Sequence, residues 1–314
     1  MDTNQVRRKP CLTVGADWKV SQTARAVDPL AERISMLLTP LPGARDILLD
    51  KLQQIRTALG NARTSHTNVT SKHRAYLDAI AEASRQLRGQ IRPADIDELL
   101  HTHRYWTLVQ MTMPDRPEPV ISDLLDIELD DRLFELDATI ATTREAFNRW
   151  GTNAGRLVLP DTNFYLRHPR VLKNIDFHKL LDTDDTITVL FPLVVLEELD
   201  HAKRRNDSGR DKALVALAVL EAHAKDGLSG KWKDAPHGAP TGRGEIWFDV
   251  VLDPPGHVPH PKPDPELVGR AVAIEALAGR NLTFLTFDTH QRSRARGAGL
   301  QDVRKLDELK TDDD

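Results

Sequence analysis

Four acidic residues in the C-terminal half stand directly after a predicted strand or on the helix that follows it: Asp161, Glu198, Asp264 and Asp288. The strands expected before them are apolar or β-branched runs at 156–159, 186–191, 245–252 and 282–286. In a parallel sheet, functional groups gather in the crevice outside the carboxyl ends of the strands. We therefore expect these four carboxylates to meet in one crevice.

Carboxylates that meet in this way need a cation. Two carboxylates about 5 Å apart repel each other by roughly 3 kcal/mol at an effective dielectric constant near 20, and four of them force either proton uptake or cation binding. A ligand set made only of oxygen suits Mg²⁺ or Mn²⁺ rather than zinc. Such ions polarise a phosphodiester and generate hydroxide for in-line attack. The pattern predicts a hydrolytic site that needs no protein nucleophile.

Several assignments within this set stay open from the residues alone. Each Asp taken singly is also an ordinary helix N-cap. Glu197 and Glu198 are adjacent, and because neighbours on a helix point about 100° apart, only one of them can face the crevice. Asp264 and Glu266 likewise compete at one helix start.

The apolar pattern divides the chain into two halves with different periodicity. Residues 1–150 are expected to form an all-helical domain, because apolar residues recur at helical spacing within 30–38, 47–59, 76–87, 94–100 and 124–150. Residues 151–314 alternate predicted strands with helices at about 193–203, 209–225, 265–277 and 290–298. This alternation predicts a parallel sheet covered by helices on both faces. Residues 227–244, rich in Gly, Pro and Lys, are expected to be a loop.

The acidic motifs carry a family resemblance. Pro160-Asp-Thr-Asn163, the Glu-Leu-Asp string at 198–200, the helix start at Asp264 and Leu285-Thr-Phe-Asp288 resemble PIN-domain nucleases from about Gly155 to Leu306. The resemblance implies a PIN-like, Rossmann-like domain at 151–314 and metal-dependent endoribonuclease activity. It also implies that the four acids are the catalytic, metal-binding residues, with Asn163 and Thr286 orienting water or a ligand carboxylate.

Basic residues follow two of the acids closely. Those expected to contact RNA on either side of the cut are Lys203, Arg204, Arg210, Arg292 and Arg296. The alternative is that they form solvated helix faces with ordinary ion pairs. Arg292 and Arg296 share one helix face by their spacing.

Composition excludes several other classes of protein. The single cysteine, Cys11, rules out an internal disulfide framework and a Cys-based zinc cage, and without cysteine partners the pairs His101/His103 and His257/His260 do not indicate zinc. His101–Arg104 is expected to be a helix end or turn. The chain shows neither a secretory segment nor an apolar run of the roughly 18 residues that span a membrane. We expect a cytoplasmic protein.

The leading hypothesis is a Mg²⁺- or Mn²⁺-dependent endoribonuclease whose helical domain recruits RNA, a regulatory partner or a second subunit as a homodimer. The alternatives are a structure-specific DNA nuclease and a catalytically silent PIN scaffold that binds RNA or protein. A phosphohydrolase with Asp161 as covalent nucleophile is disfavoured, because position 163 is Asn rather than a second Asp.

Overall fold

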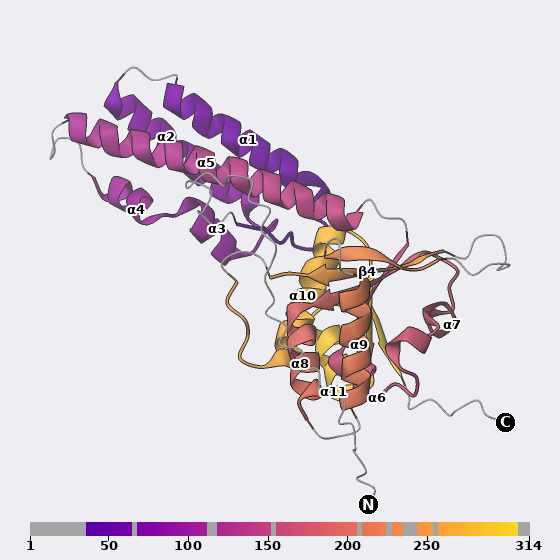
Figure 1. The fold of residues 1–314 in the computed structure, drawn as a ribbon. Coiled ribbons are helices and arrows are strands. Elements are labelled where there is room, and N and C mark those ends of the chain that lie inside the picture. The colour runs from indigo at the N-terminus through magenta and orange to yellow at the C-terminus, as the bar shows by residue number, and fades with distance from the viewer. Residues whose placement is uncertain are drawn as a thin grey trace, which may run out of the picture. The chain divides into compact units, whose positions relative to one another are not determined.

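Five helices make up the described part of the N-terminal half (Figure 1). The structure is a computed structural model that describes residues 36–64, 68–111, 118–151, 155–205, 209–223, 228–234, 244–253 and 257–306. The helices are α1 (Arg45–Thr64), α2 (Val69–Leu87), α3 (Pro93–Leu100), α4 (His103–Gln110) and α5 (Glu118–Gly151). His101 ends α3 and the Thr102 hydroxyl caps α4, so the predicted break at 101–104 is confirmed. No helix in the described ranges is long and apolar enough to cross a membrane.

The helix predicted at 30–38 from apolar spacing is wrong where the structure describes those residues. Residues 36–39 are not helical, although Leu38 is fully buried. Residues 30–35 lie outside the described ranges. Leu38 contributes to the core from an irregular segment, so burial there does not require helical periodicity.

Helices α1 and α5 pack against each other, and charged pairs line their contact. Arg56 binds both carboxylate oxygens of Asp137 at 3.0 and 3.1 Å, and Arg63 binds Asp130 in the same bidentate manner. Each partner advances by seven residues, in opposite directions along the two helices, so the helices are antiparallel. These pairs are exposed and individually contribute little to stability, but they fix the register.

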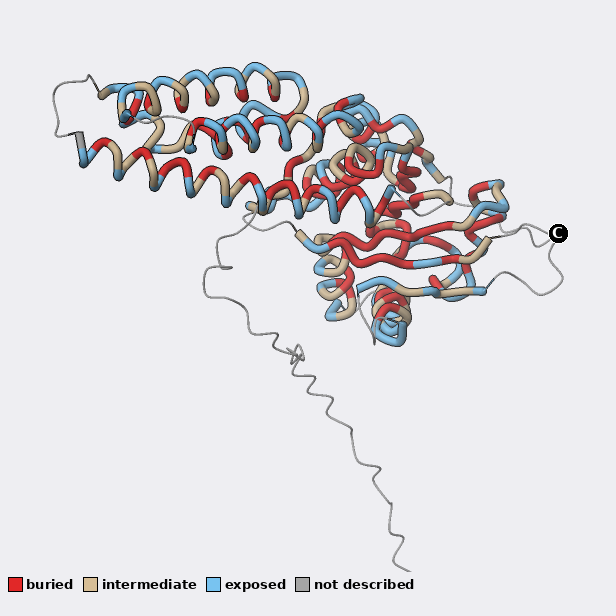
Figure 2. Tube along the Cα trace, turned by 90° about the horizontal axis from the view of Figure 1, so that it is seen from above, coloured by how far each residue is buried: buried red, intermediate tan, exposed pale blue. Residues whose placement is uncertain are grey.

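A six-stranded sheet forms the centre of the C-terminal half, in the order β3-β4-β2-β1-β5-β6. Its strands are β1 (Arg156–Pro160), β2 (Ile187–Pro192), β3 (Ser229–Lys233), β4 (Ile246–Val251), β5 (Leu282–Thr286) and β6 (Asp302–Lys305). All neighbours are parallel except β3 and β4. The central strands are buried along almost their whole length (Figure 2), as expected for a sheet covered on both faces.

Helices connect the strands. They are α6 (Thr162–Arg167), the 3₁₀ turn η2 (Leu172–Asn174), α7 (Phe177–Leu181), α8 (Leu193–Lys203), α9 (Arg210–His223), α10 (Pro263–Ala278) and α11 (Thr289–Gly297). The chain places β2 and β4 on one side of β1 and then crosses to β5 and β6 on the other side. The order of strands therefore reverses between β1 and β5, which is where open α/β sheets bind their ligands.

The predicted α/β class is confirmed, with two corrections. The stretch 227–244 is not only a loop, because 229–233 form the antiparallel edge strand β3. Trp232 on this strand packs against Phe177 with ring centroids 5.9 Å apart, so the ring belongs to the core periphery. The sheet is therefore mostly, not wholly, parallel. The short elements α6, α7 and β6 also went unpredicted.

Polar contacts join the two halves, which share one compact unit over residues 35–314. Arg45 at the start of α1 donates to the carbonyl oxygen of Leu277 at 2.8 Å and to that of Phe147 at 3.2 Å. Arg149 near the end of α5 binds both carboxylate oxygens of buried Asp249 on β4. The predicted boundary at residue 150 stays a prediction.

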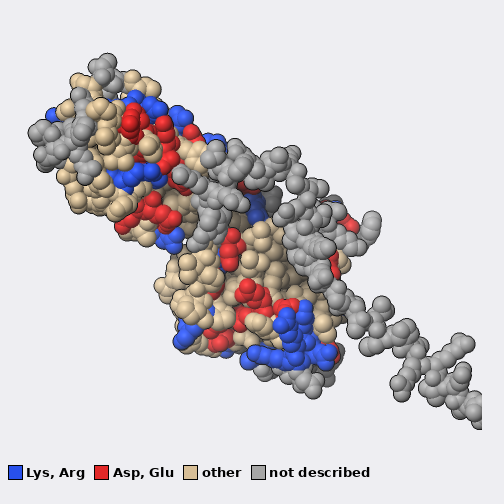
Figure 3. Space-filling model, turned by 60° about the vertical axis from the view of Figure 1, so that its left-hand side comes forward, with Lys and Arg blue, Asp and Glu red and all other residues tan. Residues whose placement is uncertain are grey.

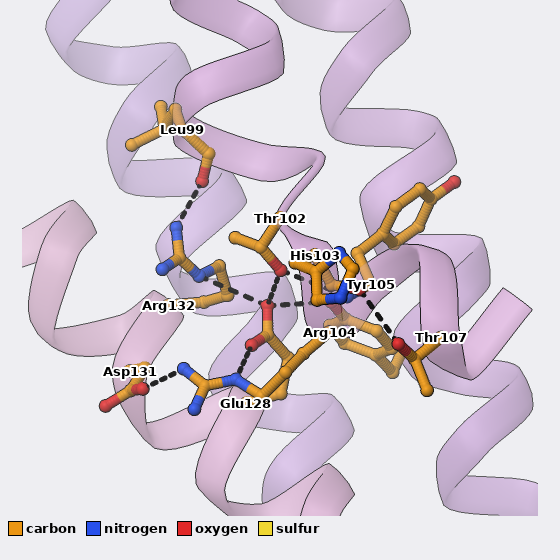
Figure 4. A network of polar contacts seen from close by, with 10 residues as sticks. Leu99, Thr102, His103, Arg104, Tyr105, Thr107, Glu128, Asp131 and Arg132 are labelled. Carbon is orange, nitrogen blue, oxygen red and sulfur yellow. Dashed lines mark hydrogen bonds and ion pairs between the residues drawn. The ribbon is translucent and has the colours of Figure 1, made fainter.

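A buried carboxylate organises the helical half (Figure 4). Glu128 on α5 is fully buried and accepts hydrogen bonds from Tyr76 at 3.2 Å and from Thr102 at 2.8 Å. The Arg104 guanidinium binds its other oxygen at 2.8 Å, and Arg132 lies 3.3 Å away. The network ties α2, α4 and the α3–α4 junction to α5.

We predict that Glu128→Ala lowers the free energy of unfolding by about 3–5 kcal/mol, because it removes one partner of a buried ion pair and leaves Arg132 without its carboxylate. Chemical denaturation of the full chain measures the loss. The control is Glu145→Ala on the exposed face of α5, which we expect to change stability by no more than about 0.5 kcal/mol. Equal effects of the two substitutions would contradict the assigned role of Glu128.

Candidate metal centre

Asp161 stands at the junction of β1 and α6, and the backbone holds it there. Its N–H donates to the carbonyl oxygen of Leu285 at 2.9 Å, which continues the β1–β5 ladder by one residue. One carboxylate oxygen caps α6 by accepting from the Phe164 N–H at 2.6 Å, and the other accepts from the Thr286 hydroxyl at 2.5 Å. The side chain is thus both a helix cap and a member of the predicted acidic set.

Burial makes the charge of Asp161 costly. The residue is 3 % exposed, and burial is the main cause that raises the pKa of its carboxyl to about 6. The hydrogen bonds from Thr286 and Phe164 oppose this rise, whereas the nearby charges of Asp288 and Asp264 add to it. Three predicted acids from different elements therefore interact electrostatically.

Thr286 links two of these acids at the end of β5. Besides donating to Asp161, its hydroxyl accepts a hydrogen bond from the Asp288 N–H at 2.9 Å. Asp288 in turn caps α11 by accepting from the His290 N–H at 2.7 Å. The structure thus places Thr286 between Asp161 and Asp288. Its supporting role, like that of half-buried Asn163 on α6, stays a prediction.

The structure distinguishes Glu198 from Glu197. Glu197 is exposed, whereas Glu198 accepts a hydrogen bond from the Thr162 hydroxyl at 2.5 Å. Burial raises the pKa of Glu198, and the charge of Asp264 raises it further, against the lowering effects of the Thr162 bond, Arg205 and His201. Glu198 is therefore the neighbour that faces the acidic set.

The same comparison separates Asp264 from Glu266 at the start of α10. Asp264 is exposed and acts electrostatically on both Asp161 and Glu198, with Arg294 at 3.7 Å from its carboxylate. Glu266 is buried and bound elsewhere, to His257 at 2.8 Å and to Arg270 at 3.1 Å. Asp264 is therefore the member of this pair that shares the crevice.

Glu266 belongs to a separate polar cluster. Ligand atoms of Asp253, His257 and Glu266 lie within 4.8 Å of one another, the only such group of three in the part of the chain that the structure describes. Arg270 approaches Asp253 at 2.7 Å as well as Glu266. A guanidinium thus already supplies the positive charge in this cluster. Although burial raises the pKa of Glu266, the His260 N–H, His257 and Arg270 lower it overall.

The donor set at the crevice fits a hard divalent cation. Asp161, Glu198, Asp264 and Asp288 offer only carboxylate oxygens, the ligands that Mg²⁺ and Mn²⁺ prefer. Each oxygen accepts at more than one lone pair, so the hydrogen bonds to Asp161 leave capacity for a cation. The pKa values of Asp161 and Glu198 stay raised because burial outweighs the hydrogen bonds and positive charges near them.

Basic residues lie close to acids on the C-terminal half (Figure 3). Lys203 and Arg204 both form ion pairs with Asp200. Such ordinary ion pairs on a helix face are the alternative to RNA contact that the sequence left open for these two residues. Arg210 and Arg296 are exposed and Arg292 is half-buried. Contact of these residues with RNA stays a prediction.

Sequence reasoning missed two contributors to the crevice. The first is Thr162, whose hydroxyl orients Glu198. Its position directly after Asp161, at the start of α6, was the available signal. The second is His201, which acts electrostatically on Glu198 together with Arg205. His201 is three residues after Glu198 and so shares its side of the helix.

A Rossmann-like α/β domain with acids at the carboxyl ends of its strands defines the class of this half of the chain. Residues 158–304 match the family model described as PIN domain, so the C-terminal half is a PIN domain, as the resemblance predicted. PIN domains are generally nucleases, and the N-terminal half matches no family model. No curated protein and no solved structure matches the chain with significance.

The raised pKa of Asp161 predicts a pH-dependent stability. Between its ordinary value of 3.8 and about 6, the folded protein binds this proton more tightly than the unfolded chain. The free energy of unfolding of the metal-free protein should therefore fall by about 3 kcal/mol as the pH rises through this window.

Asp161→Asn should remove this fall and make the metal-free protein about 1–3 kcal/mol more stable at pH 7.5. Urea unfolding in EDTA at pH 4.5 and 7.5 measures both effects, and about 2 kcal/mol of the fall lies between these two pH values. Exposed Asp123→Asn serves as the control and should keep the pH dependence of the original chain. An Asp161→Asn protein that is less stable at pH 7.5 would refute the electrostatic account.

Proposed function

We propose that this protein is a Mg²⁺- or Mn²⁺-dependent endoribonuclease that hydrolyses phosphodiester bonds at the Asp161 crevice. The observation that carries the proposal is the buried Asp161 carboxyl, whose pKa is raised to about 6 by burial and by the charges of Asp288 and Asp264. A buried carboxylate among other carboxylates is costly for a purely structural site. A role in cation binding would explain why the chain buries this carboxylate despite the energetic cost.

The PIN domain match supports the reaction class, and the PIN resemblance supports RNA as its substrate. The four acids would hold a divalent cation, which would supply Lewis-acid polarisation of the phosphodiester and a water of lowered pKa. Asp161 and Asp288 would hold it from the ends of β1 and β5, and Glu198 and Asp264 from α8 and α10.

The chain's own hydroxyls position these ligands. Thr162 fixes the rotamer of Glu198 through its bond to Oε2, and Thr286 fixes that of Asp161 through its bond to Oδ2. Both bonds hold carboxylates in place before a cation arrives, which reduces the entropy lost on binding. The burial of Asp161 also excludes water from one side of the crevice.

We expect cleavage of single-stranded RNA by the full chain in Mg²⁺ or Mn²⁺, loss of cleavage in EDTA, and a loss of at least about 100-fold in kcat/KM for Asp161→Asn. A gel assay with labelled RNA measures these rates, with single-stranded DNA and DNA flaps of matched sequence as parallel substrates. Faster cleavage of DNA would assign a DNA nuclease instead. RNA binding without cleavage in every metal would assign a silent scaffold.

The adjacent glutamates provide a matched pair of variants. Glu198→Gln should lower kcat/KM for RNA by about 100-fold or more, because its carboxylate faces the acidic set. Glu197→Gln, which makes the same chemical change one residue earlier at an exposed position, should keep kcat/KM within about twofold. Similar losses in both variants would contradict the assignment of Glu198.

A further inference from the structure

A cleft of about 390 Å³ opens beside the acidic crevice, between the N-terminal half and the PIN domain. Its floor is mostly apolar and comes from α10 and α11, where Val268, Gly269, Val272 and Ala298 line it. Arg92, at the start of α3, and Arg294, on α11, add two guanidinium groups. The volume falls within the roughly 300–1,000 Å³ typical of ligand pockets.

The cleft lies next to one of the four acids, Asp264. Pro265, which lines it, follows Asp264 directly on α10. Arg294 both lines the cleft and lies 3.7 Å from the Asp264 carboxylate. An RNA strand that passes Asp264 would therefore come next to this cleft.

The lining matches the chemistry of a nucleotide. Apolar side chains can pack against the face of a base. This contact is open to any base, because every base has a π-face. Guanidinium groups bind phosphate oxygens, with five N–H donors in a planar fork. Arg92 is held ready for this by a bidentate pair with Asp95, at 2.8 and 3.1 Å, which uses only part of its donor set.

We propose that this cleft binds a nucleotide of the RNA strand next to the scissile phosphate, with the base on the α10–α11 floor and the phosphate at Arg92 and Arg294. The proposal rests on the proposed nuclease function and assigns the N-terminal half a direct part in substrate binding, through Arg92. A PIN domain alone would supply only one wall.

Two substitutions fill the cleft without touching the acids. Gly269 lies on the exposed face of α10, and a Cβ added there meets nothing within 4 Å, so Gly269→Leu projects its side chain into the cleft without a backbone clash. Ala298→Leu does the same from exposed Ala298 at the end of α11. The matched control is Gly60→Leu in the interior of α1, where an added Cβ likewise meets nothing.

The first measurement is the affinity of the full-length protein for a fluorescein-labelled, single-stranded 12-nucleotide RNA, by anisotropy in Ca²⁺ with the RNA shown to stay intact. We expect Gly269→Leu and Ala298→Leu to weaken binding at least tenfold and Gly60→Leu to leave it unchanged. Wild-type affinity in both cleft variants overturns the proposal.

The second measurement is hydrolysis of bis(p-nitrophenyl) phosphate in Mn²⁺, a small phosphodiester that carries no neighbouring nucleotide for the cleft to bind. The cleft variants should retain this activity within about twofold while losing RNA binding. An equal loss on the small substrate would place their effect on the acidic crevice and overturn the proposal. If the original chain hydrolyses neither substrate in any metal, the proposed function fails, and the RNA affinities still decide whether the cleft binds RNA.

Discussion

The burial of one carboxylate, that of Asp161, is the constraint around which the crevice is arranged. Removing a charged carboxylate from water is costly, and a backbone N–H and the Thr286 hydroxyl offset only part of that cost. The pKa of the group stays raised to about 6. The side chain is held in this buried position, because the Asp161 N–H donates a hydrogen bond to the carbonyl oxygen of Leu285 on β5. The charge of Asp161 is therefore only partly compensated by the groups that contact it.

The topology of the sheet explains why acids far apart in the sequence act on Asp161. Strands β1 and β5 are central neighbours, and the chain reverses its direction of sheet growth between them. Asp161 and Asp288 follow these two strands directly, while α8 and α10 carry Glu198 and Asp264. Helices α8 and α10 also contact each other. Residues separated by more than 120 positions thus interact because of strand order.

Much of this arrangement could be predicted from local patterns, and the remainder depends on long-range contacts. The run at 282–286 and the helix at 193–203 match the structure in their bounds, because continuous apolar or amphipathic sequence determines them. Strand β3 could not be predicted from the sequence, since Ser229–Lys233 is mostly polar. Its extended conformation depends on pairing with β4. The choice of Glu198 over Glu197 likewise depended on Thr162, a contact across 36 residues.

The helical half packs against the helix that carries Asp264, one of the four candidate metal ligands. Helix α10 has 16 residues, so it spans about 24 Å. Its N-terminal turn carries Asp264, and its C-terminal end packs against α5 and accepts the hydrogen bond from Arg45 to Leu277. Gly279, which ends α10 in the left-handed conformation, admits Arg45 because a Cβ there would lie 2.5 Å from the arginine side chain. A helix moves nearly as a rigid rod, so contacts that fix one end constrain the other. Contacts with the N-terminal half therefore help to fix the position of Asp264, consistent with the single compact unit that residues 35–314 form.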